Sequence, residues 1–168
     1  MTKLKIFLTK GKGEGVTKES AYCEALNNAG LINLNLIKLT SVLPHNCEVI
    51  NKKPKFSSKD YGKKLYVIMS KIMTSKASET VCAGLGWTKK KNGAGYGLVV
   101  QIEGPSKEKV EQEIRNSLNE IAIYGKNEGK KKMNIVTEEI TCKNKPVCVL
   151  VVLAFNKIEG WNNPVRSF

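Results

Sequence analysis

The segment Asn35-Leu36-Ile37-Lys38-Leu39-Thr40-Ser41-Val42-Leu43-Pro44 decides how the rest of the chain is interpreted. An apolar run from Leu31 to Leu39 predicts a strand, a Thr-Ser pair follows it, and the Leu-Pro dipeptide is a turn signal. A hydroxyl pair at the end of a strand has two interpretations. It begins a loop and satisfies nearby backbone groups, or its backbone is held in a sparsely populated conformation that stores strain for chemistry on the chain itself.

The composition is that of a globular protein. A length of 168 residues suits one domain whose hydrophobic core is large enough to fold without disulfides or a structural metal ion. The hydrophobic residues make up 41% of the chain, an ordinary share. We expect this domain to span residues 1–155 and a tail to span residues 156–168. The longest apolar run, Val147 to Phe155, is too short to cross a bilayer, and the first residues do not resemble a signal peptide.

The cysteines and the charge restrict the classes of function. Five cysteines are an odd number and show no CxxC spacing, which argues against a disulfide scaffold and a zinc site and favours the cytoplasm. The net charge of +13 comes mostly from lysine, with runs at 89–91 and 130–132 that we expect at loop tips. Such runs suit a nucleic-acid or membrane-surface patch or a solvated surface. We favour the solvated surface, because no aromatic residues interleave with the lysines as a stacking platform requires.

Hydrophobic periodicity predicts two helices, one that Thr17 caps and Gly30 ends, and one that starts at Ser106. Apolar residues at helical spacing give each a single buried stripe, formed by Tyr22, Ala25, Leu26 and Ala29 in the first and by Val110, Ile114, Leu118 and Ile121 in the second.

Strands are expected between and around these helices, at residues 4–9, 31–40, 64–69, 80–87, 95–103, 133–141 and 146–155. The glycine-rich residues 11–15 are expected to form a flexible turn, and the polar residues 45–62 a long loop. This order of elements indicates an α+β fold, with two sheets packed face to face and the helices outside.

The run Gly11–Pro44, GKGEGVTKESAYCEALNNAGLINLNLIKLTSVLP, resembles the amino-terminal region of the pyruvoyl-dependent arginine decarboxylases. The shared pattern is a Gly-rich turn with Glu-Gly, a helix that ends Asn-Ala-Gly, and Asn-Leu-Ile-Lys followed by Leu-Thr-Ser and a hydrophobic pair before proline. The run Gly97–Gly104, GLVVQIEG, is similar to the family's second active-site strand. The resemblance spans about residues 4–155 and implies a four-layer αββα sandwich.

The resemblance also implies a self-processing enzyme. The Ser41 hydroxyl would attack the Thr40 carbonyl carbon, and elimination and hydrolysis would leave a covalent pyruvoyl group at position 41 of a chain cut into residues 1–40 and 41–168. A protein-bound ketone can condense with a substrate amine and accept the electrons released as carbon dioxide departs, so no external cofactor is needed.

Three further positions follow from the resemblance. Asn35, six residues before the serine, matches a family asparagine whose amide could donate to a developing oxyanion; otherwise it is a polar residue on the outward face of a strand. Gln101 stands where the family has its catalytic glutamate, and a glutamine cannot give a proton as a general acid. Glu103 lies on the same face of the strand and could substitute, although it matches a family glutamate of its own.

Substrate recognition shows a second departure from the family pattern. The family binds the guanidinium group with an aspartate seven residues before the helix-ending glycine, and that position is Cys23, whose thiol cannot pair bidentately. Glu19, one turn earlier on the same helical face, could reach the same pocket. The resembled enzymes are trimers with sites between subunits, so we expect a homotrimer.

Three hypotheses remain open at this point. The leading one is a pyruvoyl-dependent decarboxylase that converts arginine to agmatine for polyamine synthesis. The second is a paralogue with lost or changed activity, which Gln101 and Cys23 favour. The third is a basic binding protein on the same fold, which the lysine runs favour weakly.

Overall fold

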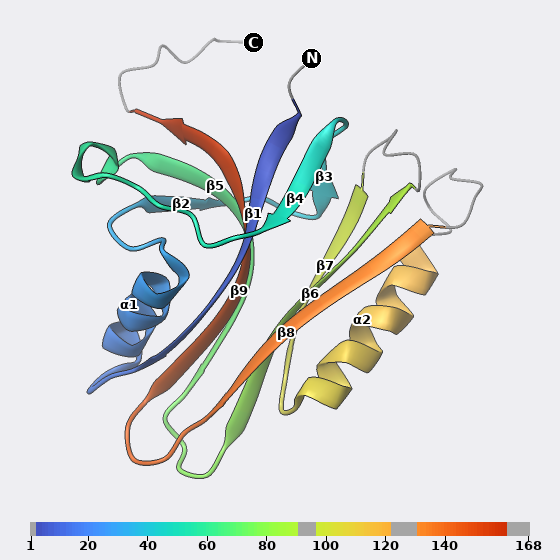
Figure 1. The fold of residues 1–168 in the computed structure, drawn as a ribbon. Coiled ribbons are helices and arrows are strands. Elements are labelled where there is room, and N and C mark those ends of the chain that lie inside the picture. The colour runs from blue at the N-terminus through green and yellow to red at the C-terminus, as the bar shows by residue number, and fades with distance from the viewer. Residues whose placement is uncertain (1–2, 91–96, 122–130, 161–168) are drawn as a thin grey trace.

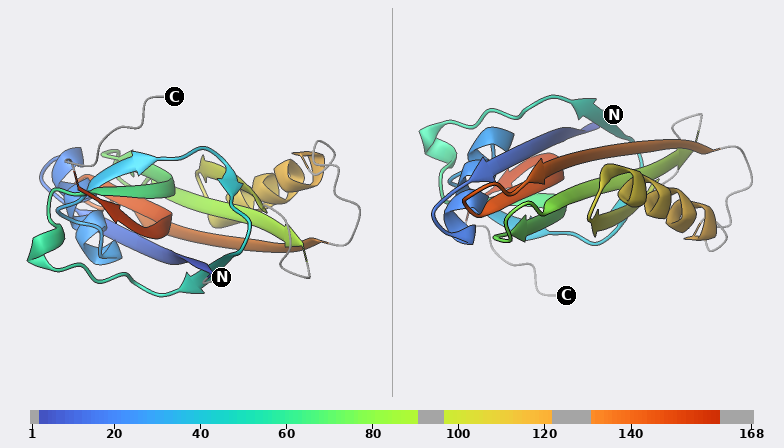
Figure 2. Two further views of the ribbon diagram at one scale, coloured as in Figure 1. Left: turned by 90° about the horizontal axis from the view of Figure 1, so that it is seen from above. Right: turned by 90° about the horizontal axis from the view of Figure 1, so that it is seen from below.

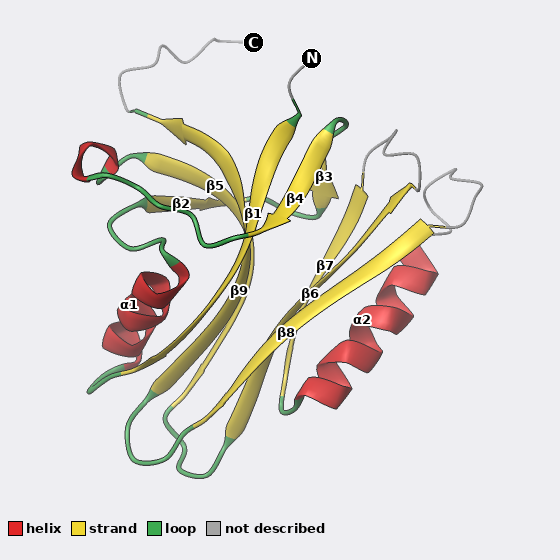
Figure 3. Cartoon of the chain, in the orientation of Figure 1, coloured by secondary structure: helices red, strands yellow, loops and turns green. Residues whose placement is uncertain are grey.

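The computed structural model describes residues 3–90, 97–121 and 131–160. Two β-sheets pack face to face, and one helix lies on the outer face of each (Figures 1 and 3). The views from above and below show the two helices at opposite sides of the sheets (Figure 2). The α+β fold predicted from the sequence and the αββα sandwich that the family resemblance implies are therefore both confirmed.

The larger sheet has five strands in the order β2-β5-β9-β1-β4. The pairs β2–β5 and β1–β4 are parallel, and the other two pairs are antiparallel. The strand bounds are β1 Leu4–Glu14, β2 Asn35–Lys38, β4 Cys47–Asn51, β5 Lys64–Thr74 and β9 Val147–Glu159.

The smaller sheet has four strands in the order β3-β7-β6-β8, and all its pairs are antiparallel. Its strands are β3 Val42–Leu43, β6 Thr80–Lys90, β7 Gly97–Gly104 and β8 Lys131–Thr141. The described residues also include the helices α1 Lys18–Ala29 and α2 Lys107–Ile121 and the short 3-10 helix η1 Ser58–Asp60.

The strand β9 shows why the chain contains one long apolar run. All nine residues of Val147–Phe155 are buried. Alternate residues belong to two cores: the odd-numbered ones pack between the two sheets, and the even-numbered ones pack beneath α1. A strand covered on both faces cannot alternate with polar residues, so the run is continuous.

The helix α1 begins and ends where the sequence predicts. The Thr17 hydroxyl accepts a hydrogen bond from the Ser20 backbone amide, and Gly30 adopts the left-handed conformation at φ 77°. The buried residues of α1 are Ala21, Ala25 and Ala29. The buried stripe therefore includes Ala21, which was not predicted, while Tyr22 and Leu26 are only partly buried.

The glycine-rich segment is a strand, so the prediction of a flexible turn at residues 11–15 is wrong. β1 continues to Glu14, because α1 lies directly on its glycines. A Cβ on Gly11 would lie 1.9 Å from the Ala25 carbonyl oxygen, and one on Gly13 would lie 2.1 Å from the Ala21 carbonyl oxygen. Glycine therefore permits the close approach of helix and strand here.

The helix α2 packs on the smaller sheet in the same way. It buries Val110, Ile114 and Leu118, as predicted. Ile114 fills the space above Gly86 of β6. A Cβ added to Gly86 would lie 2.1 Å from the Cγ2 atom of Ile114. Neither α1 nor α2 has the length and hydrophobicity needed to cross a membrane.

Several predicted boundaries need correction. The strand expected at residues 31–40 begins only at Asn35, because Gly30 and Asn33 (φ 68°) turn the chain after α1. The loop expected at 45–62 contains β4, which pairs with β1, and η1. β9 extends to Glu159, four residues into the expected tail.

The lysine runs also differ from expectation. Lys89 and Lys132 pair across the ends of β6 and β8, so these residues lie in strands and not at loop tips. Lys91 and Lys130 lie outside the described residues.

Candidate active site

The chain crosses from one sheet to the other at Thr40-Ser41. Only three residues separate β2 of the larger sheet from β3 of the smaller sheet. On one side, the Leu39 amide donates to the Val67 carbonyl oxygen at 2.8 Å. On the other side, the Ser41 carbonyl oxygen accepts from the Val99 amide at 2.8 Å. The Thr40–Ser41 peptide is thus anchored to a different sheet at each end.

The carbonyl oxygen of Thr40 is held by a side chain. Gln101 Nε2, on β7, donates to it at 2.7 Å. Ser41 is the last residue of this segment that receives a hydrogen bond from a backbone amide of β7, the amide of Val99. At Thr40 the Gln101 side chain makes the next bond between the two segments. Thr40 and Ser41 are both exposed, so water and small molecules reach the peptide that joins them.

Glu103 lies two residues beyond Gln101 on β7 and contacts the larger sheet. Its Oε1 is 2.8 Å from the Ser70 hydroxyl and 3.2 Å from the Lys71 amide nitrogen. The Ser70 side chain is fully buried, accepts from the Gly84 amide at 3.1 Å and also lies 2.9 Å from the Ile102 carbonyl oxygen. This hydroxyl therefore joins strands of both sheets and fixes the position of the carboxyl group.

The Ser70–Glu103 contact is a hydrogen bond in either protonation state of the carboxyl group. A carboxylate accepts the single hydroxyl proton of Ser70. A protonated Glu103 donates to the Ser70 oxygen instead, and the serine proton then goes to the Ile102 carbonyl. Glu103 can therefore gain or lose a proton without losing its partner.

Asn35 lies at the opposite end of β2 from Thr40. Its Nδ2 donates to the Gly62 carbonyl oxygen at 2.6 Å, which ties the first residue of β2 to the loop before β5. The amide thus points to the Gly62 loop and not to the Thr40 carbonyl of the same chain. The catalytic role predicted for Asn35 stays a prediction.

The two residues predicted to bind substrate, Glu19 and Cys23, are exposed on α1 beside Tyr22. The ammonium group of Lys71 lies 4.0 Å from the centre of the Tyr22 ring. Burial, and then the nearby Cys148, Cys23 and Glu19, raise the pKa of Tyr22 above its ordinary value. Because the Lys71 backbone binds Glu103, this lysine connects the α1 face with the carboxyl group on β7.

Sequence reasoning missed Ser70 and Lys71. The available signal was their position: this polar pair interrupts the apolar run Leu65–Met73, and a polar residue inside such a strand usually has a partner. Tyr22 was assigned only to the buried stripe. Its contact with Lys71 depends on how α1 crosses β5, which no local pattern indicates.

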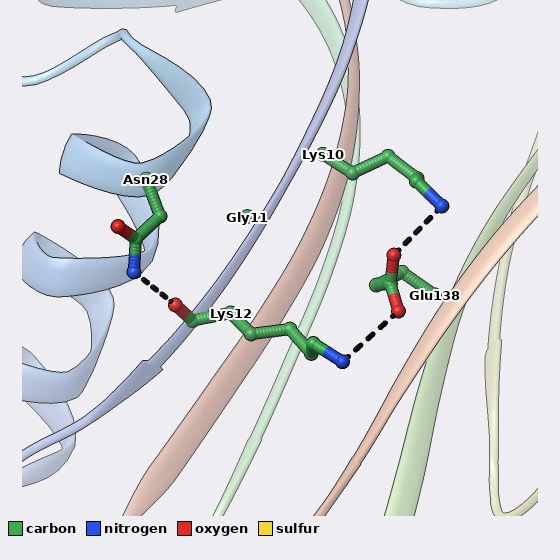
Figure 4. A pocket seen from close by; sticks show the side chains of 5 residues that line it. All are labelled: Lys10, Gly11, Lys12, Asn28 and Glu138. Carbon is green, nitrogen blue, oxygen red and sulfur yellow. Dashed lines mark hydrogen bonds and ion pairs between the residues drawn. The ribbon is translucent and has the colours of Figure 1, made fainter.

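A second cluster of polar residues lies in an open hollow between α1, β1 and β8 (Figure 4). The ammonium groups of Lys10 and Lys12 bind the two oxygens of Glu138, at 2.7 Å and 3.3 Å. Burial opposes ionisation of Glu138, but Lys10 and then Lys12 outweigh it, so its pKa lies below the ordinary value. None of the predicted site residues lies here, and the ion pairs join the two sheets.

The family model for pyruvoyl-dependent arginine decarboxylase (PvlArgDC) matches residues 5–160. The chain belongs to this family. It is 29% identical over 153 residues to the pyruvoyl-dependent arginine decarboxylase of Pyrococcus furiosus, a match that covers 91% of this chain and 95% of the relative. It is 31% identical over 154 residues to the enzyme of the same name from Thermococcus kodakarensis, covering 90% of this chain and 94% of the relative.

Membership of the pyruvoyl-dependent arginine decarboxylase family confirms the resemblance drawn from the motifs around Ser41 and Gly104. It also implies a pyruvoyl cofactor. A pyruvoyl group at position 41 would fit, because β3 and the Val99 bond would keep this residue in place if the preceding peptide were cut.

Proposed function

We propose that this chain is a carbon–carbon lyase that decarboxylates arginine to agmatine, a step of polyamine synthesis, using a pyruvoyl group that it makes by cutting itself between Thr40 and Ser41. The observation that carries the proposal is the hydrogen bond from Gln101 to the Thr40 carbonyl oxygen. A carbonyl that is held by a donor, next to a serine whose own carbonyl is anchored, is arranged for attack by that serine's hydroxyl.

Self-cleavage proceeds through chemistry that serine permits. Ser41 Oγ bonds to the Thr40 carbonyl carbon, the peptide C–N bond breaks, and the hydroxyl proton moves to the Ser41 nitrogen. Elimination then removes the Ser41 α-proton and releases Thr40 with a free carboxylate. Uptake of one water and loss of one ammonia leave a ketone at residue 41.

The pyruvoyl group supplies a ketone that binds the substrate amine and accepts the electron pair left by carbon dioxide. The chain's own residues hold the substrate and move the proton. We assign proton donation to Glu103, because it shares a face of β7 with Gln101 and keeps its Ser70 partner in both protonation states. The Gln101 amide donates a hydrogen bond but cannot transfer a proton as a general acid.

The substrate's distal group is assigned to the exposed face of α1. Glu19 supplies a carboxylate for the guanidinium group, and Cys23 lies one turn further on the same face. The neighbouring Lys71 carries a like charge, which weakens the binding of a cation there.

We further propose a homotrimer with its sites between neighbouring subunits, as the resemblance implies, in which Asn35 acts at such an interface. Both β2 and β3 are edge strands, so the segment around Ser41 is open to a neighbouring chain. We place the protein in the cytoplasm, since its five cysteines are free in the structure.

Two measurements test this function. An intact-mass spectrum under denaturing conditions should show two fragments cut between Thr40 and Ser41, with the larger one blocked at its amino end. Purified protein should release carbon dioxide from arginine. The variant Ser41→Ala should stay a single chain of 18.6 kDa and release none. An uncut wild-type chain would remove the self-cleavage chemistry and leave only the fold.

A further inference from the structure

We propose that Gln101 is the hydrogen-bond donor that activates the Thr40 carbonyl for self-cleavage. Because this amide is uncharged, the cleavage rate does not depend on the ionisation of a carboxyl group at this position. The inference rests on the proposed self-cleavage and deepens it. It gives Gln101 a role in making the cofactor and leaves proton transfer during turnover to Glu103.

The geometry supports this role for Gln101. A carbonyl oxygen only accepts hydrogen bonds, so the contact of 2.7 Å is made by the amide nitrogen of the side chain. When Ser41 Oγ attacks, negative charge grows on this oxygen, and a donor already in place stabilises that charge without further rearrangement.

The Thr40 carbonyl is also prevented from turning away from its donor. Ser41 is bound to Val99, two residues before Gln101 on the same strand, and Leu39 is bound to the other sheet. β7 itself is held along its length by β6, with Gln101 opposite Leu85. The donor and both flanking anchors are therefore fixed by strand pairing.

A glutamate at position 101 would behave differently. It donates only when protonated, and its ionised form would repel the developing oxyanion. Cleavage also leaves a carboxylate on Thr40 at this place, and two carboxylates within hydrogen-bond distance repel each other. The glutamine amide donates to the peptide carbonyl before the cut and to the new carboxylate after it.

Other charged groups surround this part of β7. Glu103 lies on the face toward the larger sheet, while the ammonium group of Lys71 lies beside Tyr22 on α1. Lys38 ends β2, and His45 follows β3. The charged residues of α2 lie on the opposite face of the smaller sheet. All of these groups are unchanged in variants at position 101, so the ratio of variant to wild-type cleavage rate removes their contribution.

The test follows the cleavage of freshly translated full-length chain in a cell-free system, across about pH 5 to pH 8. The variants are Gln101→Leu, Gln101→Glu and the control Gln112→Glu, which makes the same change on the exposed face of α2. Fragment masses report the cut. Hydroxylamine, which cleaves esters, reports accumulation of the Thr40–Ser41 ester before elimination.

We expect Gln101→Leu to slow cleavage about a hundredfold, the usual loss for one oxyanion donor. The rate of Gln101→Glu relative to wild type should fall about tenfold for each pH unit above the pKa of the introduced carboxyl group. Gln112→Glu should cleave at the wild-type rate. Gln101→Glu also serves where the leucine variant fails to fold, because it nearly keeps the shape of glutamine.

Two results would overturn the role of Gln101: wild-type cleavage rates in Gln101→Leu, or a ratio of Gln101→Glu to wild type that does not change with pH. In either case the wild-type chain would still be cut at Thr40-Ser41, and the proposed function would stand. A wild-type chain that is never cut refutes both.

Discussion

The Ser70 hydroxyl on β5 lies 2.8 Å from the Glu103 carboxyl oxygen on β7, and this bond joins the two sheets two residues beyond Gln101 on β7. A buried hydroxyl that also accepts from the Gly84 amide has a fixed orientation. Glu103 is thus a positioned carboxyl group on a strand, although the residue itself is exposed.

The first prediction concerns proton transfer by Glu103. Glu103→Gln should lower kcat for arginine decarboxylation about 10²- to 10³-fold, within the usual range for loss of a general acid. Self-cleavage should continue, because the Gln101–Thr40 bond remains. Steady-state kinetics and an intact-mass spectrum measure the two effects separately. Glu113→Gln, on α2, is the control, and equal kcat values for both variants would exclude Glu103 as the acid.

The second prediction concerns substrate recognition on α1. Cys23→Asp places a carboxylate beside Tyr22. Its negative charge attracts the guanidinium group and offsets the positive charge of Lys71, so the KM for arginine should fall about tenfold. Asn116→Asp adds the same charge on α2 and should leave KM unchanged. If Cys23→Asp also leaves KM unchanged, this face of α1 does not bind the guanidinium group.

The third prediction concerns the ion pairs between the sheets (Figure 4). The folded-state pKa of Glu138 is lowered, so its stabilisation is complete above the unfolded-state pKa and is lost as pH falls through the folded-state value. At neutral pH, Glu138→Gln should lower the free energy of unfolding by up to about 1 kcal/mol, because the lysines are partly exposed.

Urea unfolding of wild type and Glu138→Gln at pH 7 and at about pH 3 measures this difference. The difference should shrink at the acidic pH, because the carboxyl group takes up a proton as the pH falls through its lowered folded-state pKa. It should also shrink as salt is added. A difference that is the same at both pH values would mean that packing, and not charge, is responsible.

The fourth prediction concerns the close packing of α1 on β1. Gly11→Ala should cost about 3 kcal/mol or more, because its Cβ would overlap the Ala25 carbonyl and α1 would have to move. Gly160→Ala is the control, since nothing lies within 4 Å of its added Cβ, and it should change stability by less than about 0.5 kcal/mol. Equal unfolding midpoints for the two variants would contradict this packing.

The helices were the most predictable elements, because their signals are local. Thr17 and Gly30 lie next to the helix ends that they cap, and the stripe of α2 repeats within a few turns. The glycines of β1 misled the prediction. A glycine run favours a turn when its own conformation is considered, and only the helix packed above it makes it a strand.

The sequence by itself determined the family and the candidate reaction, because the motif around Thr40-Ser41 and the strand that ends at Gly104 are contiguous and specific. The tertiary structure alone decided which groups meet. Gln101 is 61 residues from Thr40 along the chain, and Glu103 is 33 residues from Ser70. Such contacts follow from how two sheets pack and in which register their strands pair, and hydrophobic periodicity specifies a strand's faces but not its partner across the core.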